Sequence, residues 1–208
     1  MIKNDTEFPS KGDSFYNINE NLDSNSWLNK DNASFYNFAK GYEITFLMLC
    51  NDINENMDKR DYLINPLLFN LRHYIELILK AIIENLKFSL FVFDKIKHDE
   101  NSYLFIDEHR LLPLWELMIK LLGQLKEHNK DDSLTATKNL IKELQETDPN
   151  GENFRYPFGK NKKNNKTLDY IDVINLIDSG KKLINILDSL FLQSKSLNAK
   201  SELNLDYV

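Results

Sequence analysis

The stretch NPLLFNLRHYIELILKAIIENL, residues 65–86, decides the fold. At 100° per residue, its apolar side chains cover more than half of a helical circumference, and the polar ones fall on a single stripe. A helix that is apolar on most sides must be covered on most sides, so we expect it at the centre of an all-helical domain. Pro66 suits the first helical position, with Asn65 as its cap. The stripe consists of Arg72, His73, Glu76, Lys80 and Glu84.

Four further segments have the apolar spacing of amphipathic helices. They run from about Ala33 to Met57, from Leu111 to Lys126, over 134–148 and over 167–193. Together with the central helix they predict an all-α fold, an up-and-down bundle of about five helices. Gly41 lies inside the first segment, where glycine costs about 1 kcal/mol relative to alanine. We therefore expect a close helix crossing at Gly41.

The domain organisation follows from composition along the chain. Residues 33–193 form the predicted bundle. Residues 1–32 are polar and rich in turn residues, but they contain too many aromatic side chains for a purely disordered tail. We expect an arm that packs on the bundle and is held by Trp27. Residues 194–208 resemble a frayed, flexible tail. Residues 87–108 either extend the central helix or form a short extended segment, and a short helix followed by a loop is the preferred interpretation.

Composition narrows the class of protein. The 208 residues include only 6 Gly and 5 Pro, which favours helix over sheet. The net charge of −6 gives no overall attraction to nucleic acid, although a local basic patch would still provide one. A single cysteine, Cys50, suits a reducing compartment, and its apolar neighbours predict a buried thiol. There is no signal-peptide core and no run of about 18 apolar residues. We expect a soluble, cytoplasmic protein that does not enter membranes, and the many Lys, Asn and Ile residues are typical of an AT-rich bacterial genome.

The usual metal and nucleotide motifs are missing from the sequence. No histidine has another histidine three or four residues away, and no HExxH motif occurs. The four histidines are His73, His98, His109 and His128. A phosphate-binding Walker loop, GxGxxG and GxSxG are also absent. We therefore predict no metal site and no cofactor.

The polar stripe has two interpretations. Arg72 and His73 are the residue types that cleave RNA without a metal, because a histidine transfers the proton and an arginine stabilises the charged phosphorane. Alternatively, Arg72, Glu76 and Lys80 form salt bridges at i, i+4 and have a structural role. Charges on so apolar a helix would be partly buried and would need partners. Arg155 is the expected partner from elsewhere in the chain.

The loop after residue 148 is a second candidate site. It contains Pro-Asn-Gly, a strong turn signal, followed by Phe-Arg-Tyr-Pro at 154–157. Arg155 and Tyr156, an arginine beside aromatic rings, would stack on a base or clamp a phosphate, or they would anchor the loop with the guanidinium on a carboxylate such as Glu76. The lysines that follow would either contact phosphates or remain solvated. They include Lys160, Lys162 and Lys163.

Three phrases together resemble a group of bacterial helical proteins similar to the HEPN superfamily. They are RHYIELILKAII at 72–83, EHRLLPLW at 108–115 and DPNGENFRYPF at 148–158. The resemblance covers roughly residues 62–193. It implies a helical bundle that often forms dimers, in a toxin–antitoxin or antiphage-defence system. Some members of the superfamily are metal-independent RNases, and others are not catalytic.

The chain departs from the catalytic members of that superfamily. They carry an arginine followed four to six residues later by a histidine, and no arginine of this chain has a histidine at that spacing. Two functions therefore remain open. The first is a non-catalytic module that forms a homodimer or docks on a protein partner. The second is a divergent endoribonuclease, with RNA as substrate and a cluster of Arg72, His73, His109 and Arg155 as catalytic groups.

Overall fold

The structure is a computed structural model, and the chain divides into two compact units, Met1–Ala33 and Ser34–Val208. The residues it describes are 8–16, 18–26, 34–92, 106–125, 132–156 and 169–205. In the first unit a 3₁₀ turn, η1, spans Leu22–Ser24, and Asn19 and Asn25 exchange two hydrogen bonds of 2.8 Å. Trp27 lies outside the described residues, so packing of the arm on the bundle stays a prediction.

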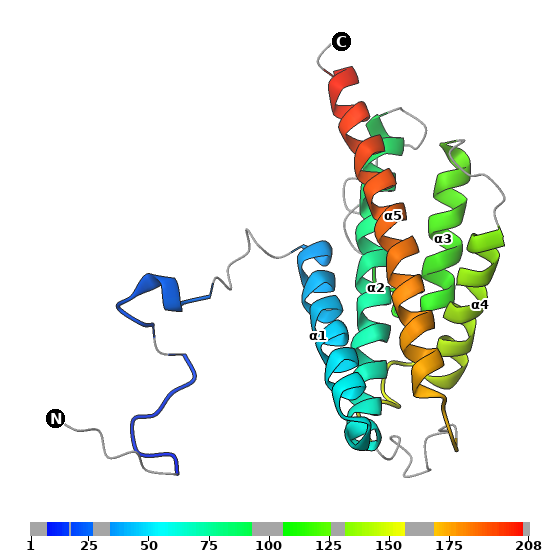
Figure 1. Cartoon of the computed structure of the whole chain (residues 1–208). Coiled ribbons are helices and arrows are strands. Elements are labelled where there is room, and N and C mark those ends of the chain that lie inside the picture. The colour runs from blue at the N-terminus through cyan, green and yellow to red at the C-terminus, as the bar shows by residue number, and fades with distance from the viewer. Residues whose placement is uncertain are drawn as a thin grey trace. The chain divides into compact units, whose positions relative to one another are not determined.

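The second unit is a bundle of helices, and the predicted all-α fold is confirmed (Figure 1). The described helices are α1 (Phe35–Glu55), a 3₁₀ turn η3 (Met57–Lys59), α2 (Arg60–Val92), α3 (Leu111–Gln124), α4 (Asp132–Thr147) and α5 (Val173–Leu205). The part of the chain that the structure describes contains no strand. One step departs from strict up-and-down order, because α3 begins beside the middle of α2 and runs in the same direction (Figure 1).

Helix α2 is the central helix, as its apolar circumference predicts. It packs against α1, α3 and α5. Tyr74, Ile78 and Ile82 are fully buried. The helix is longer than predicted, because it begins at Arg60 directly after η3 and continues to Val92. Pro66 is therefore inside the helix rather than at its start, and Asn65 is not its cap.

Helix α1 begins close to the predicted residue, but Gly41 inside it does not mark a helix crossing. The Ser34 hydroxyl caps the helix by accepting a hydrogen bond of 3.1 Å from the Asn37 backbone N–H. A Cβ placed on Gly41 would meet nothing within 4 Å, so the expected crossing at that residue is wrong. The close crossing lies at Gly180 of α5, where a Cβ would be 2.7 Å from Cζ of Phe46.

Helix α5 differs from the prediction at both ends. It begins at Val173, and the Asp172 carboxylate caps it by accepting a hydrogen bond of 3.1 Å from the Asn175 backbone N–H. It continues to Leu205, so residues 194–205 are helical and the prediction of a frayed tail from residue 194 is corrected. The extension packs on α2, since buried Ser194 accepts a hydrogen bond of 3.1 Å from the Asn85 side chain. The longer α2 supplies this packing surface.

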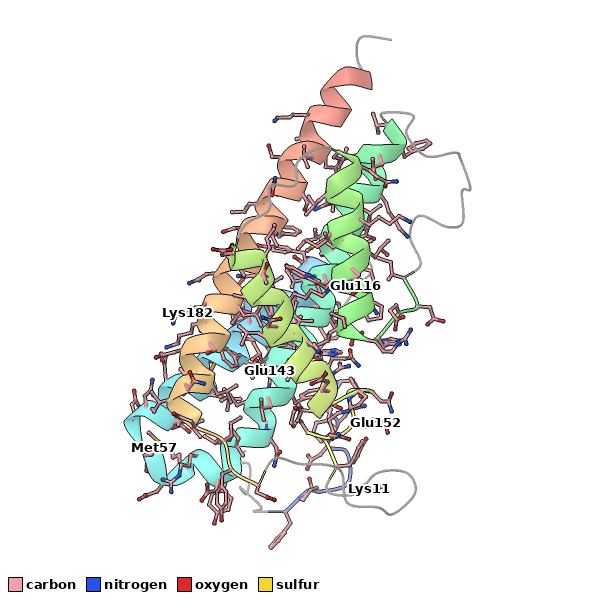
Figure 2. All side chains as sticks on the ribbon, turned by 90° about the vertical axis from the view of Figure 1, so that its right-hand side faces the viewer. Lys11, Met57, Glu116, Glu143, Glu152 and Lys182 are labelled. Carbon is pink, nitrogen blue, oxygen red and sulfur yellow. The ribbon has the colours of Figure 1, made fainter. Side chains whose placement is uncertain are left out.

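The remaining segments agree with the helical pattern. Residues 87–92 extend α2, whereas residues 93–105 lie outside the described part of the chain. Glu116 on α3 and Lys182 on α5 are exposed charged side chains on the outside of the bundle (Figure 2). Cys50 is fully buried, and burial raises the pKa of its thiol to about 11, which makes it a poor nucleophile. None of the described helices is long and apolar enough to span a membrane.

Candidate functional site

The centre of the polar stripe is a buried network of charges. The side chains of Arg72, Glu76 and Lys80 are only 3%, 6% and 5% exposed. Nη1 of Arg72 donates to Oε2 of Glu76 at 3.1 Å, and Nζ of Lys80 donates to Oε1 of Glu76 at 3.1 Å. These are the two i, i+4 contacts that the salt-bridge interpretation predicts.

Two loops complete this network. Nη2 of Arg72 donates to the His109 carbonyl at 3.1 Å, and Nε donates to the Asp148 carbonyl at 3.3 Å. Oδ2 of Asp148 also lies 3.3 Å from Nε of Arg72, an ion pair, although it accepts no hydrogen bond from the described residues. The Nδ1 atom of His109 lies 2.8 Å from Oε1 of Glu76. We call Arg72, Glu76, Lys80, His109 and Asp148 the buried ion network.

Electrostatics keep Glu76 ionised in this network. Burial alone raises the pKa of its carboxyl group, but hydrogen bonds from His109 and Lys80 and the charges of Lys80 and Arg72 outweigh burial, so the pKa lies below its ordinary value. An ionised carboxylate only accepts hydrogen bonds, so Nδ1 of His109 carries the proton that it donates. Every member of the network therefore has a partner of opposite charge or a hydrogen-bond partner.

The turn after α4 is shaped to fit Arg72. Oδ1 of the fully buried Asp148 accepts hydrogen bonds of 2.8 and 3.0 Å from the backbone N–H groups of Glu152 and Asn153. Gly151 has φ of +73°, and a Cβ on it would lie 2.8 Å from Nη1 of Arg72. Only glycine suits both the backbone conformation and the contact. The turn is thus fastened to the middle of α2.

Arg155 does not join that network, and the expected contact with Glu76 is wrong. Its Nε donates instead to the Gly151 carbonyl at 2.8 Å. Its guanidinium carbon lies 5.8 Å from the centroid of the Phe69 ring and 5.5 Å from that of Tyr156, which are cation–π distances. Arg155 is exposed, and the Tyr156 side chain is 55% exposed.

His73 packs on the same Phe69 ring as Arg155. The His73 and Phe69 rings stack at 5.6 Å with an interplanar angle of 14°, and the edge of Tyr42 approaches His73 at 4.4 Å. Burial, together with the positive charges of Arg72, Arg155 and Lys80, lowers the pKa of His73. These effects outweigh the charge of Glu76, which acts to raise that pKa. The imidazole is therefore neutral at pH 7. We call Tyr42, Phe69, His73, Arg155 and Tyr156 the Arg155 cluster.

The structure separates the residues that the sequence singled out. The buried ion network holds Arg72, Glu76, Lys80 and His109, whereas the Arg155 cluster holds His73, Arg155 and Tyr156. Lys160, Lys162 and Lys163 lie outside the described residues. Sequence reasoning missed Asp148, although the Asp-Pro-Asn-Gly turn signal contains it. It also missed Phe69, because a phenylalanine on an apolar helix gives no signal of its own.

The chemistry open to these two groups differs. Arg72 and Lys80 are too buried and too fully paired to reach a substrate, whereas His73 and Arg155 are not. Within the described ranges, no three His, Cys, Asp or Glu side chains come together to hold a metal ion.

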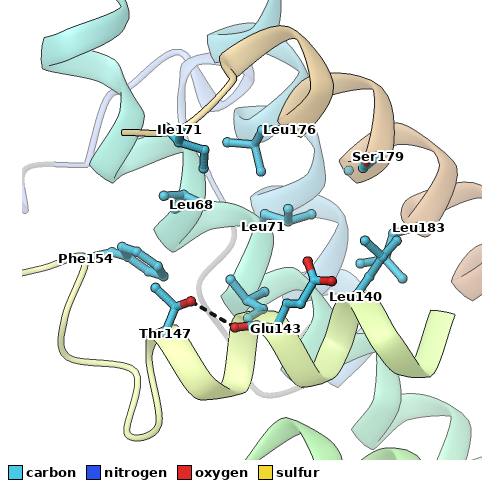
Figure 3. Close-up of a pocket in the computed structure, with 12 residues that line it drawn as sticks. Leu68, Leu71, Leu140, Glu143, Thr147, Phe154, Ile171, Leu176, Ser179 and Leu183 are labelled. Carbon is cyan, nitrogen blue, oxygen red and sulfur yellow. Dashed lines mark hydrogen bonds between the residues drawn. The ribbon is translucent and has the colours of Figure 1, made fainter. Parts of the chain in front are cut away.

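A separate pocket of about 120 Å³ lies between α2, α4 and α5 and is lined mainly by leucines such as Leu68, Leu140 and Leu183 (Figure 3). Glu143, Thr147 and Ser179 are the polar residues of its otherwise apolar lining.

No family model, no curated protein and no solved structure matches this chain.

Proposed function

We propose that this chain is a non-catalytic helical interaction module, which self-associates or docks on a protein partner in a bacterial defence or toxin–antitoxin system. The sequence resemblance to the HEPN superfamily supports the choice of system. The observation that carries the proposal is the outer face of α1, which exposes three large apolar side chains among small and polar ones and whose partly exposed Asp52 is paired with Lys59.

This outer face runs along most of α1. Phe38, Ile44 and Met48 are 57%, 55% and 66% exposed. The exposed residues of α1 before Glu55 are Asn37, Phe38, Gly41, Ile44, Thr45, Met48, Asn51 and Asn54. The partly exposed charges beside them, Lys40 and Asp52, are paired within the protein with Glu43 and Lys59. An exposed helix normally has more unpaired charges on its solvent side, so large apolar side chains exposed here favour a protein contact.

A second copy of the chain suits this face because its residue pattern is symmetric. In an antiparallel pair of α1 helices centred near residue 43, Phe38 of one copy would lie opposite Met48 of the other, a favourable sulfur–aromatic pairing. Gly41 would lie opposite Thr45, and two small residues let the helices approach closely. The contact would be isologous, as in most homodimers, and no like charges would oppose it.

The buried ion network supports a module without catalysis. Arg72 was the first candidate to stabilise a charged transition state, but its donors are directed at Glu76, Asp148 and His109. A catalytic arginine must be free to contact the reacting group. The buried ion network therefore has a structural role, because it joins α2 to the segment before α3 and to the turn after α4.

Analytical ultracentrifugation over a wide concentration range tests the proposal. We expect the wild-type chain to show a reversible monomer–dimer equilibrium and Ile44→Glu to remain monomeric, because each interface would bury two carboxylates. Ala136→Glu is the matched control, because it adds the same charge to an exposed position on α4. A wild-type chain that stays monomeric would exclude self-association, and equal dimerisation of Ile44→Glu would exclude α1 as the interface.

A metal-independent endoribonuclease is the second candidate, and one observation favours it. His73 and Arg155, two of the predicted catalytic groups, contact the same Phe69 ring. If they act together, the purified protein cleaves RNA in the presence of EDTA, and both His73→Asn and Arg155→Ala lose the activity while Arg60→Ala retains it. Arg72→Ala is a poor test, since it breaks the buried ion network. Equal cleavage by all variants would indicate a contaminant.

A further inference from the structure

Arg155 stands apart from the other arginines that the structure describes. Arg60, Arg72 and Arg110 each have a carboxylate within ion-pair distance, at 3.7, 3.1 and 2.7 Å. Among the described residues no carboxylate lies within ion-pair distance of Arg155, and its hydrogen bond to the Gly151 carbonyl uses only Nε. The two terminal nitrogens are thus available on an exposed side chain.

The guanidinium is also held in place before any ligand arrives. Its Nε bonds to the Gly151 carbonyl at 2.8 Å, and Gly151 itself packs on the buried Arg72. Asp148 holds the turn around Gly151 in place, because its carboxylate accepts hydrogen bonds from the backbone N–H groups of Glu152 and Asn153. Two rings lie near the guanidinium, those of Phe69 and Tyr156. A rigid arginine fork loses little entropy when it binds a planar, bidentate acceptor.

The surrounding charges indicate the class of acceptor. The other cations that act on His73 are Arg72 and Lys80, and both are buried and neutralised by Glu76 and Asp148. In the described part of the cluster, one unneutralised cation therefore remains, on a chain of net charge −6. A nucleic-acid strand binds through a row of cations that track its phosphates, and the described residues place no second unneutralised cation beside Arg155, the lysines at 160, 162 and 163 lying outside them. A single guanidinium beside two aromatic rings is instead suited to bind a single carboxylate that has an aromatic or apolar side chain next to it.

We propose that the Arg155 cluster is a docking site for an acidic side chain of a protein partner. The partner's Asp or Glu carboxylate accepts hydrogen bonds from both terminal nitrogens of Arg155, and its neighbouring aromatic side chain packs on the exposed ring of Tyr156. Arginine and tyrosine are the residue types that dominate protein interfaces energetically. This inference rests on the proposed role as an interaction module, but it does not depend on self-association through α1.

The test follows the side-chain Nε–H signals of arginine by NMR in the ¹⁵N-labelled full chain. The probe is the capped peptide Gly-Glu-Tyr-Gly, and the control is Gly-Gln-Tyr-Gly, which lacks the charge. Arg155→Lys identifies the Arg155 signal by its loss. We expect the glutamate peptide to shift this signal saturably and to leave that of Arg60 unchanged. The glutamine peptide should bind about tenfold more weakly or not at all, because hydrogen bonds to charged groups are the strong ones.

Two variants make the result specific to the cluster. Followed through the peptide's own signals, Arg155→Lys should weaken binding about tenfold, because lysine keeps the charge but lacks the fork. Arg60→Lys makes the same change on another surface and should bind as the wild type does. Ile44→Glu should also bind normally, so that failure of docking is distinguishable from failure of self-association.

Three results would overturn the inference. The first is an Arg155 signal that does not respond to the glutamate peptide. The second is an equal response to both peptides, which would show that the carboxylate is not recognised. The third is saturation by inorganic phosphate or by a single-stranded oligoribonucleotide at lower concentration than by the peptide, which would assign the cluster to phosphate ligands.

Discussion

Arg72 and His73 are neighbours in sequence, yet the structure gives them opposite environments. Arg72 lies in the buried ion network, where its donors have partners inside the protein. His73 lies in the Arg155 cluster beside an exposed arginine. Adjacent residues on a helix point 100° apart, and that rotation is enough to place one inside the bundle and the other at its surface. The type of a charged residue alone therefore does not identify a functional site. Its burial and its ion-pair partners determine whether it can contact a ligand.

The largest expected effect is loss of a partner inside the buried ion network. Arg72→Ala leaves the buried Asp148 without a charged partner and removes one of the two cations that pair with Glu76. Breaking a buried ion pair in this way typically costs about 3–5 kcal/mol of unfolding free energy. Urea unfolding followed by circular dichroism measures it. Lys138→Ala is the control, since it breaks the exposed pair with Glu116 and should cost less than about 1 kcal/mol.

The same experiment separates charge pairing from packing. A variant that replaces Arg72, Glu76 and Lys80 together with methionine removes all three charges and keeps most of the volume. It should recover part of the stability that Arg72→Ala loses, because no charge remains at positions 76 and 80 to need a partner, whereas Asp148 still lacks Arg72. A triple variant as unstable as Arg72→Ala would show that the contacts to the two loops, rather than charge balance, hold the bundle together.

The next largest effect is expected at the turn that links the two regions. Gly151→Ala should cost about 1–3 kcal/mol, because alanine disfavours a positive φ and its Cβ would press on Arg72. Gly123→Ala in α3 is the matched control, since a Cβ there meets nothing within 4 Å. It should be neutral or stabilise by up to about 1 kcal/mol. Equal effects of the two substitutions would contradict the fitted turn.

The bundle itself was accessible from the sequence, because apolar periodicity reports burial directly. Helix α2 was placed correctly as the central helix. The ends of α2 and α5 were not predicted, because the two extensions depend on each other. Ser194 of α5 is buried and bonded to Asn85 of α2 only when the two helices pack together. Local patterns carry no information about such pairing.

The sites were less predictable for a related reason. The i, i+4 ladder of Arg72, Glu76 and Lys80 is a local pattern, and it was found. Its partners Asp148 and His109 lie in loops, and neither loop has a sequence periodicity that would predict its contact with α2. Arg155 was predicted to pair with Glu76 on the ground that buried charges need partners, but a closer histidine fills that place.

A smaller effect on the free energy of unfolding is expected when the pH is lowered. The pKa of Glu76 in the folded state lies below its ordinary value of 4.5, so the folded protein releases this proton more readily than the unfolded chain does. The stabilisation is therefore complete above pH 4.5 and is lost as the pH falls through the folded pKa. Unfolding free energies measured across this range should fall more steeply for the wild type than for Glu76→Gln. Parallel curves would show that Glu76 is not the group that titrates.

The smallest effect on stability is expected in the Arg155 cluster. Arg155→Ala loses one partly buried hydrogen bond and two cation–π contacts of an exposed side chain, which together are worth about 1 kcal/mol. Thermal unfolding of this variant, compared with Arg72→Ala, gives the contrast directly. If Arg155→Ala were as destabilising as Arg72→Ala, the cluster would be part of the structural fastening. A nearly unchanged stability together with lost peptide binding is the result that only a docking site produces, because nothing inside the bundle then requires this arginine.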